Sequence, residues 1–71
     1  MSDAVRWQTN NGEPVSIGDY VAIDLDSDAI GRIVEICGDS TGRPVVEVTE
    51  GRRRGKKVTV WPSQMLLRVL R

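Results

Sequence analysis

Short segments in which apolar and polar residues alternate are the main pattern along this chain. Residues 19–25, with the sequence DYVAIDL, place Val21 and Ile23 on one face and Tyr20 and Asp24 on the other. A period of two residues is typical of a β-strand with one buried face. The pattern, which contains no helical stripe longer than two turns, predicts five strands, at residues 19–25, 31–37, 44–50, 56–61 and 66–70.

Turn-forming residues separate these runs. Residues 37–44, CGDSTGRP, contain two glycines and a proline, which favour a turn. Residues 50–57, EGRRRGKK, have a glycine at each shoulder of a hairpin loop. Residues 61–65, WPSQM, place Pro62 where a strand must stop and leave room for one tight helical turn. The chain is therefore expected to be all-β, a five-stranded SH3-like barrel with a single helical turn before the last strand.

The first fourteen residues leave two alternatives. The Asn-Gly pair at 11–12 is favoured in hairpins, so residues 4–9 would form a short strand that carries Trp7. The other alternative is a flexible arm. We therefore divide the chain into residues 1–14, an N-terminal arm or short hairpin strand, and residues 15–71, the SH3-like barrel.

Alternation also divides the apolar residues between the core and the surface. The expected core consists of the inward residues of the five strands: Val21, Ile23, Val34, Ile36, Val46, Val48, Val58, Val60, Leu67 and Val69. Four apolar residues are expected to point outward, where they are candidates for a subunit interface: Val45, Trp61, Leu66 and Leu70.

The chain length of 71 residues limits the size of the core. Below roughly 70–80 residues, a single core seldom supplies more than about 3–5 kcal/mol of stability. Because Cys37 is the only cysteine and histidine is absent, neither a disulfide framework nor the usual zinc site can add to the stability that the core supplies. We therefore expect a homo-oligomer. The lone thiol, without a secretory signal or a membrane-spanning apolar run, predicts a cytoplasmic protein with no membrane partner.

The formal net charge of zero conceals a polarised sequence. Residues 1–50 contain all ten acidic residues and three arginines, which gives a formal charge of −7. Residues 51–71 contain seven cationic residues and no acid, which gives +7. Such asymmetry bears on the choice of partners rather than on the fold.

Three short motifs resemble known families. Residues 18–21, GDYV, followed by residues 31–36, GRIVEI, resemble the opening of KOW and other SH3-like modules. A more specific resemblance, over residues 17–70, is to the type II dihydrofolate reductases of plasmids and integrons. It rests on Gly18-Asp19-x-Val21, Gly31-x-Ile33-Val34 and Val58-Thr59-Val60-Trp61-Pro62. The resemblance implies an SH3-like barrel that forms a tetramer around one central pore, where NADPH and dihydrofolate bind.

The reductase motif is incomplete in this chain. Val58, Val60 and Pro62 match its apolar frame, whereas the family has glutamine and tyrosine at the positions of Thr59 and Trp61. The lysine by which the family attracts its anionic ligands corresponds to Ile23 here. A pore without this positive charge would attract two anionic ligands poorly, so we expect the fold to be shared rather than the activity.

Residues 24–35, DLDSDAIGRIVE, partly match the pattern of a calcium-binding loop. An EF-hand register would use four oxygen-bearing side chains, those of Asp24, Asp26, Asp28 and Glu35. The sharp turn of that loop requires a glycine where this chain has Ala29, and the flanking segments are expected to be strands. The favoured interpretation is an acidic loop between two strands, with no metal.

Catalytic chemistry has little support in the sequence. Without histidine, a catalytic triad in its usual form is impossible. No glycine-rich phosphate loop follows a strand and opens a helix. We therefore expect no catalytic residues and no cofactor.

The basic loop is the strongest functional signal, because five cations at a hairpin end suit contact with phosphates. By strand parity Trp61 faces outward beside it and could stack on a base, with Arg68 nearby. The leading hypothesis is a non-enzymatic binding module of a bacterial or mobile-element protein, which contacts nucleic acid or an acidic protein surface. Its expected contact residues are Arg52, Arg53, Arg54, Lys56, Lys57, Trp61 and Arg68.

Three alternatives remain open. The charged hairpin could simply keep a sheet edge in solution, with Trp61 packed between subunits. The chain could be a divergent reductase-like tetramer that uses NADPH, or a structural oligomer of unknown partner. In the reductase alternative, the pore would be lined by Val58, Thr59, Val60 and Trp61.

Overall fold

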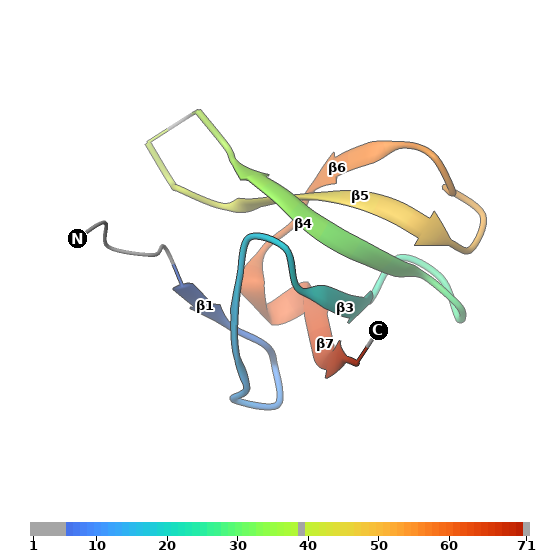
Figure 1. The fold of residues 1–71 in the computed structure, drawn as a ribbon, viewed down its shortest axis with the longest axis horizontal. Helices are drawn as coiled ribbons and strands as arrows, with labels where there is room; N and C mark the ends of the chain where they lie inside the picture. Colours follow the sequence, from blue (N-terminus) through green and yellow to red (C-terminus); the bar gives the residue numbers. More distant parts are fainter. Residues whose placement is uncertain (1–5, 39, 71) are drawn as a thin grey trace.

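The computed structural model of this chain describes residues 6–38 and 40–70, and its regular structure is strand except for one turn of 3₁₀ helix (Figure 1). The elements are β1 Arg6–Gln8, β2 Pro14–Ser16, β3 Tyr20–Ile23, β4 Ile30–Ile36, β5 Pro44–Glu50, β6 Lys57–Thr59, η1 Pro62–Gln64 and β7 Met65–Val69. This confirms the predicted all-β class and the single helical turn before the last strand. Strands β1 and β2 form the short N-terminal hairpin; residues 4 and 5 of the expected strand lie outside the described part of the chain.

The five strands from β3 to β7 form one antiparallel sheet in the order β6-β5-β4-β3-β7. The expected closure into a barrel is not seen, since no pairing joins β6 to β7 among the described residues. The N-terminal hairpin instead covers the free edge of β7. Asn10 N donates to Met65 O at 2.6 Å, and Arg68 N donates to Glu13 Oε1 at 2.8 Å. This edge is therefore protected without closure of the sheet.

The hydrophobic core lies between the inner face of the sheet and the N-terminal hairpin. Trp7 and Val15, which pair across β1 and β2, are both buried in it. The Trp7 indole Nε1 also donates to Gly42 O at 2.9 Å, which ties the hairpin to the turn between β4 and β5. The buried apolar residues are Trp7, Val15, Val21, Ile23, Ala29, Ile33, Val46, Val48, Val60 and Met65.

The predicted core is right for β3 and β5 and wrong for parts of β4 and β7. In β4 the buried residue is Ile33, whereas Val34 is half-buried and Ile36 is 39% exposed. In β7 Met65 is fully buried and Leu67 is 45% exposed. Two other predicted core residues, Val58 and Val69, are half-buried.

Gly31 explains the error in β4. A Cβ atom at this position would overlap Val46 Cγ1, and would lie 2.9 Å from Glu47 O and 3.0 Å from Ile23 Cδ1. Gly31 therefore occupies an inward site that has no room for a side chain, and the next inward residue is Ile33. The error in β7 has a different cause, because the register between β3 and β7 shifts between Ala22 and Ile23. Met65 therefore lies opposite the inward Ile23, whereas Leu67 lies opposite Ala22 on the other face.

Candidate functional site

Four cationic side chains project from the turn between β5 and β6. We call this group, Arg52, Arg53, Arg54 and Lys56, the basic turn. The hydrogen bonds that shape its backbone include Arg54 N to Gly51 O at 3.3 Å, Lys56 N to Arg53 O at 3.0 Å, and Gly55 N to Val48 O at 2.7 Å. All four residues are exposed, and their side chains make no hydrogen bond or ion pair within the described part of the chain. The cations are therefore available to a ligand.

An acidic loop, residues 24–28, lies beside the basic turn at the same end of the sheet (Figure 1). Asp26 is the point of contact: its Oδ2 accepts a hydrogen bond from Arg52 N at 3.2 Å, and its Oδ1 accepts one from Asp28 N at 3.0 Å. Gly51 allows the close approach, because it has a φ of +108° and a Cβ there would lie 3.0 Å from Ala29 Cα. The acidic loop thus supports the backbone of the basic turn.

The four acids considered as calcium ligands are not brought together. The Asp26 carboxylate accepts from two backbone amides, and Glu35 lies on β4, where it pairs with Lys57 Nζ at 3.8 Å. Among residues 6–38 and 40–70, no three His, Cys, Asp or Glu side chains are grouped so that they could hold a metal ion. The arrangement is that of an acidic surface loop.

Trp61 lies at the opposite end of the β5–β6 hairpin from the basic turn. It is 52% exposed, and the guanidinium carbon of Arg43 lies 4.4 Å from the centroid of its ring. Its backbone is extended, with φ −79° and ψ 148°, and its N–H donates to Gln64 Oε1 at 2.9 Å. The hydrogen bond thus fixes the backbone of Trp61, while its ring makes a cation–π contact with Arg43, a residue that the alternation pattern does not point to.

The segment that resembles the reductase pore alternates between the two faces along the end of β6 and the residues that follow it. Val60 is buried and Val58 half-buried against the core, whereas Thr59 and Trp61 are exposed on the other side. Ile23, at the position of the reductase lysine, is only 1% exposed. A charged ligand on the outer surface therefore cannot contact residue 23, which is apolar and buried.

Arg68 is separated from the other expected contact residues. It lies on β7, which is the opposite edge strand of the sheet from β6. Its guanidinium is 3.7 Å from Asp19 Oδ1, and its backbone N–H is bound by Glu13. The structure thus gathers Arg52, Arg53, Arg54 and Lys56 at one turn, places Lys57 at the start of β6, and leaves Arg68 at a distant edge.

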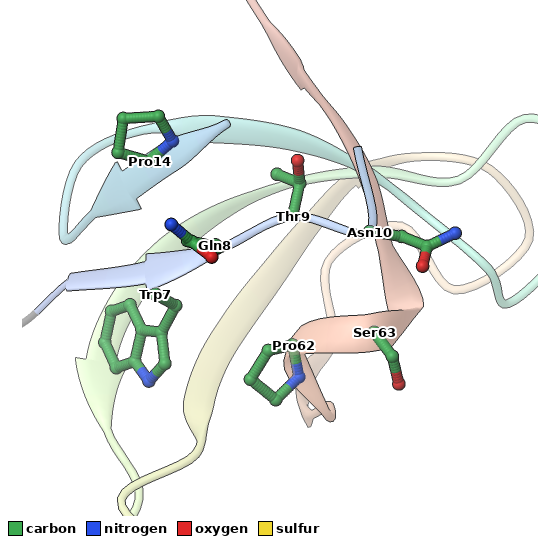
Figure 2. Close-up of a pocket in the computed structure, with 7 residues that line it drawn as sticks. All are labelled: Trp7, Gln8, Thr9, Asn10, Pro14, Pro62 and Ser63. Carbon is green, nitrogen blue, oxygen red and sulfur yellow. The ribbon is translucent and has the colours of Figure 1, made fainter. Parts of the chain in front are cut away.

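A groove between β1 and η1, with a volume of about 740 Å³, is a feature that the sequence analysis missed (Figure 2). Figure 2 shows residues of β1 and the following loop on one side of the groove and Pro62 and Ser63 on the other. Its lining is neutral, so it offers hydrogen-bonding groups and apolar surface but no acid or base for catalysis. The lining residues are Trp7, Gln8, Thr9, Asn10, Pro14, Pro62 and Ser63.

Comparison with models of known protein families, with curated proteins and with solved structures gives no match. The resemblances to type II dihydrofolate reductases and to KOW modules therefore stay predictions. Over the described residues, no helix has the length and apolar character needed to cross a membrane.

Proposed function

We propose that this protein is a non-enzymatic binding module that contacts nucleic acid through the basic turn. The observation that carries the proposal is the exposure of four cationic side chains at one hairpin turn, without ion-pair partners among the described residues. Lysine and arginine side chains that contact phosphates release counterions from the nucleic acid, which supplies affinity without sequence preference. No cofactor is part of this proposal.

The surroundings of the basic turn decide how strong such binding can be. Asp24 and Asp28 are exposed in the neighbouring loop and repel phosphates, so we expect binding that is weak at physiological salt. From Arg52 onward, however, the chain contains no acid, and arginine forms paired hydrogen bonds with phosphate oxygens. These features support an anionic partner, and the proposal commits to the phosphates of a nucleic acid.

Two further observations support a binding role. The groove between β1 and η1 has no ionisable lining residue, and histidine is absent from the chain. We also propose a cytoplasmic location, which the presence of a single cysteine, Cys37, supports.

Fluorescence anisotropy with short single- and double-stranded DNA and RNA tests the proposal. The wild-type protein should bind at about 50 mM salt and lose affinity steeply by about 200 mM. The double variant Arg53→Ala/Arg54→Ala should lower the slope of log K against log salt by roughly 1.4 for a single strand, because each phosphate contact contributes about 0.7.

The matched control is the double variant Arg32→Ala/Arg68→Ala, which removes the same charge from exposed residues outside the basic turn. We expect it to retain nearly all of the slope. Absence of binding at low salt would overturn the proposal, and so would an equal loss of affinity in the two double variants.

A further inference from the structure

The outer side of β6 forms a continuous exposed strip between the basic turn and Trp61. Lys56, Lys57, Thr59 and Trp61 are all exposed, whereas Val58 and Val60 point toward the core. No acid occurs in this segment of the chain, but two acids lie beside it: Glu35 on β4 pairs with Lys57 at 3.8 Å, and Glu47 on β5 lies opposite Lys57. The strip therefore has no acid of its own, and the charge of Lys57 is partly balanced by its neighbours.

The backbone of β6 adds hydrogen-bond donors to the strip. Val48 N donates to Lys56 O at 2.8 Å, and Val60 N donates to Pro44 O at 3.1 Å, so the backbone groups of these alternate residues face β5. In an antiparallel strand the residues between them must point the other way. Because β6 is an edge strand, the N–H groups of Lys57 and Thr59 face outward.

The strip ends at an aromatic surface. Trp61 keeps about half of its surface exposed, 52%, although Arg43 already covers part of its ring. The contact with Arg43 restricts the ring before binding, which lowers the conformational entropy that is lost when a ligand stacks on it. Base–aromatic stacking is a recurring contact of proteins that bind single strands beside a positively charged track.

We infer that the β6 edge binds single-stranded nucleic acid, with the backbone phosphates along the basic turn and Lys57 and an unstacked base against Trp61. This inference rests on the proposed function and adds the class of nucleic acid and the second point of contact. The bases of a duplex are covered by their neighbours, so their faces cannot reach Trp61. Extended chain separates Lys57 from Trp61 by roughly 13 Å, which requires a ligand that spans several nucleotides.

An oligothymidine of about 12 nucleotides, within the usual site size of small single-strand-binding domains, is the principal probe. The matched control probe is a strand of the same length made of abasic residues, which presents the same phosphates without bases. A duplex of equal length and polyglutamate of equal charge complete the set. Binding is followed by anisotropy at fixed salt and by quenching of tryptophan emission.

We expect oligothymidine to bind about fivefold or more tightly than the abasic strand, with quenching that disappears in Trp61→Phe. The Trp61→Leu variant, which keeps an apolar side chain but no aromatic ring, should bind the two strands equally and retain the wild-type salt slope. Trp61→Phe should recover part of the preference. Thermal unfolding of each variant checks the fold, which these substitutions at an exposed site should leave intact.

The outcomes separate this inference from the proposed function. Equal binding of oligothymidine, abasic strand and duplex, with the salt dependence still supplied by the basic turn, would overturn the inference alone. Absence of binding to any strand at low salt would overturn both. Quenching by polyglutamate as strong as that by oligothymidine would assign the β6 edge to an acidic protein and would also overturn the inference.

Discussion

Asp26 accepts a hydrogen bond from the backbone N–H of Arg52 at 3.2 Å, and this contact joins the acidic loop to the basic turn. The charges that are separated along the sequence are therefore adjacent in the folded chain. The −7 and +7 halves do not form two opposite faces at this point. The supporting acid makes the basic turn better defined and, at the same time, reduces its attraction for anions.

The Asp26–Arg52 contact should contribute measurably to stability. The Asp26→Ala variant loses two backbone hydrogen bonds to its carboxylate, and we expect it to lower the free energy of unfolding by about 1 kcal/mol. Amide hydrogen exchange at Arg52 should become faster as the turn loosens. Chemical denaturation and exchange measured by NMR would check both effects.

Asp28→Ala provides the control for this prediction. It removes the same charge from the same loop, yet within the described residues the Asp28 side chain accepts no hydrogen bond. Both variants should bind anions more tightly, because each removes a repulsive charge beside the basic turn. A loss of stability in Asp28→Ala as large as that in Asp26→Ala would show that the contact itself contributes nothing.

Replacement of Gly31 should destabilise the fold, because β4 approaches β5 closely at this residue. The Gly31→Ala variant would push a methyl group into Val46 and the Glu47 carbonyl, so we expect a loss of about 1–3 kcal/mol in unfolding free energy. Gly38→Ala is the matched control, because a Cβ at Gly38 would have no atom within 4 Å. Thermal unfolding should show the control within about 0.5 kcal/mol of wild type. Equal stability of the two variants would contradict this account of β4.

The sequence predicts the strands and the basic hairpin well, because their determinants are local. Period-two alternation locates β3 to β7, and the glycines at 51 and 55 delimit the turn. It does not predict which face of β4 is inward, since alternation treats Gly31 as a neutral position. Only the close approach of Val46 shows that a glycine occupies an inward site.

The Trp61–Arg43 contact depends on the register of a long-range pairing, which the alternation does not provide. Once Val45 is known to lie opposite Thr59, residue 43 falls opposite residue 61. A register assumed from the six-residue turn would pair Glu50 with Lys57 and place residue 46 opposite Trp61, so it would have missed Arg43. The Asp26–Arg52 contact could not be found from strand pairing either, because it joins two loops whose approach is set by the packing of the whole sheet.

Trp61 should be the tryptophan that solvent reaches. Trp7 is 9% exposed and Trp61 is 52% exposed, so collisional quenchers should remove the emission of Trp61 and leave that of Trp7. Because Arg43 lies over the ring, iodide should quench more effectively than caesium, and Arg43→Ala should reduce this difference. Stern–Volmer titrations at constant ionic strength would measure it. Emission that resists both quenchers would mean that Trp61 is buried between subunits.

We expect the homo-oligomer to form through the apolar side chains at β7. Leu66 and Leu67 on this strand and Leu70 directly after it are 39%, 45% and 83% exposed, and such a group of exposed apolar side chains is typical of protein contacts. We expect Leu67→Glu to lower the mass measured by light scattering toward that of one chain. Ile36→Glu, at a residue of similar exposure on β4, should leave the mass unchanged.

Light scattering combined with iodide quenching distinguishes this oligomer from a reductase-like tetramer. A tetramer with its pore at Thr59 and Trp61 would bury the indole, so its mass would depend on Trp61 and its emission would resist iodide. An oligomer formed through β7 would leave Trp61 exposed, since β6 and β7 are opposite edges of the sheet. We therefore expect iodide to quench Trp61 equally in wild type and Leu67→Glu. A wild-type protein that is monomeric even when concentrated would contradict the oligomer and would also exclude an active site formed between subunits.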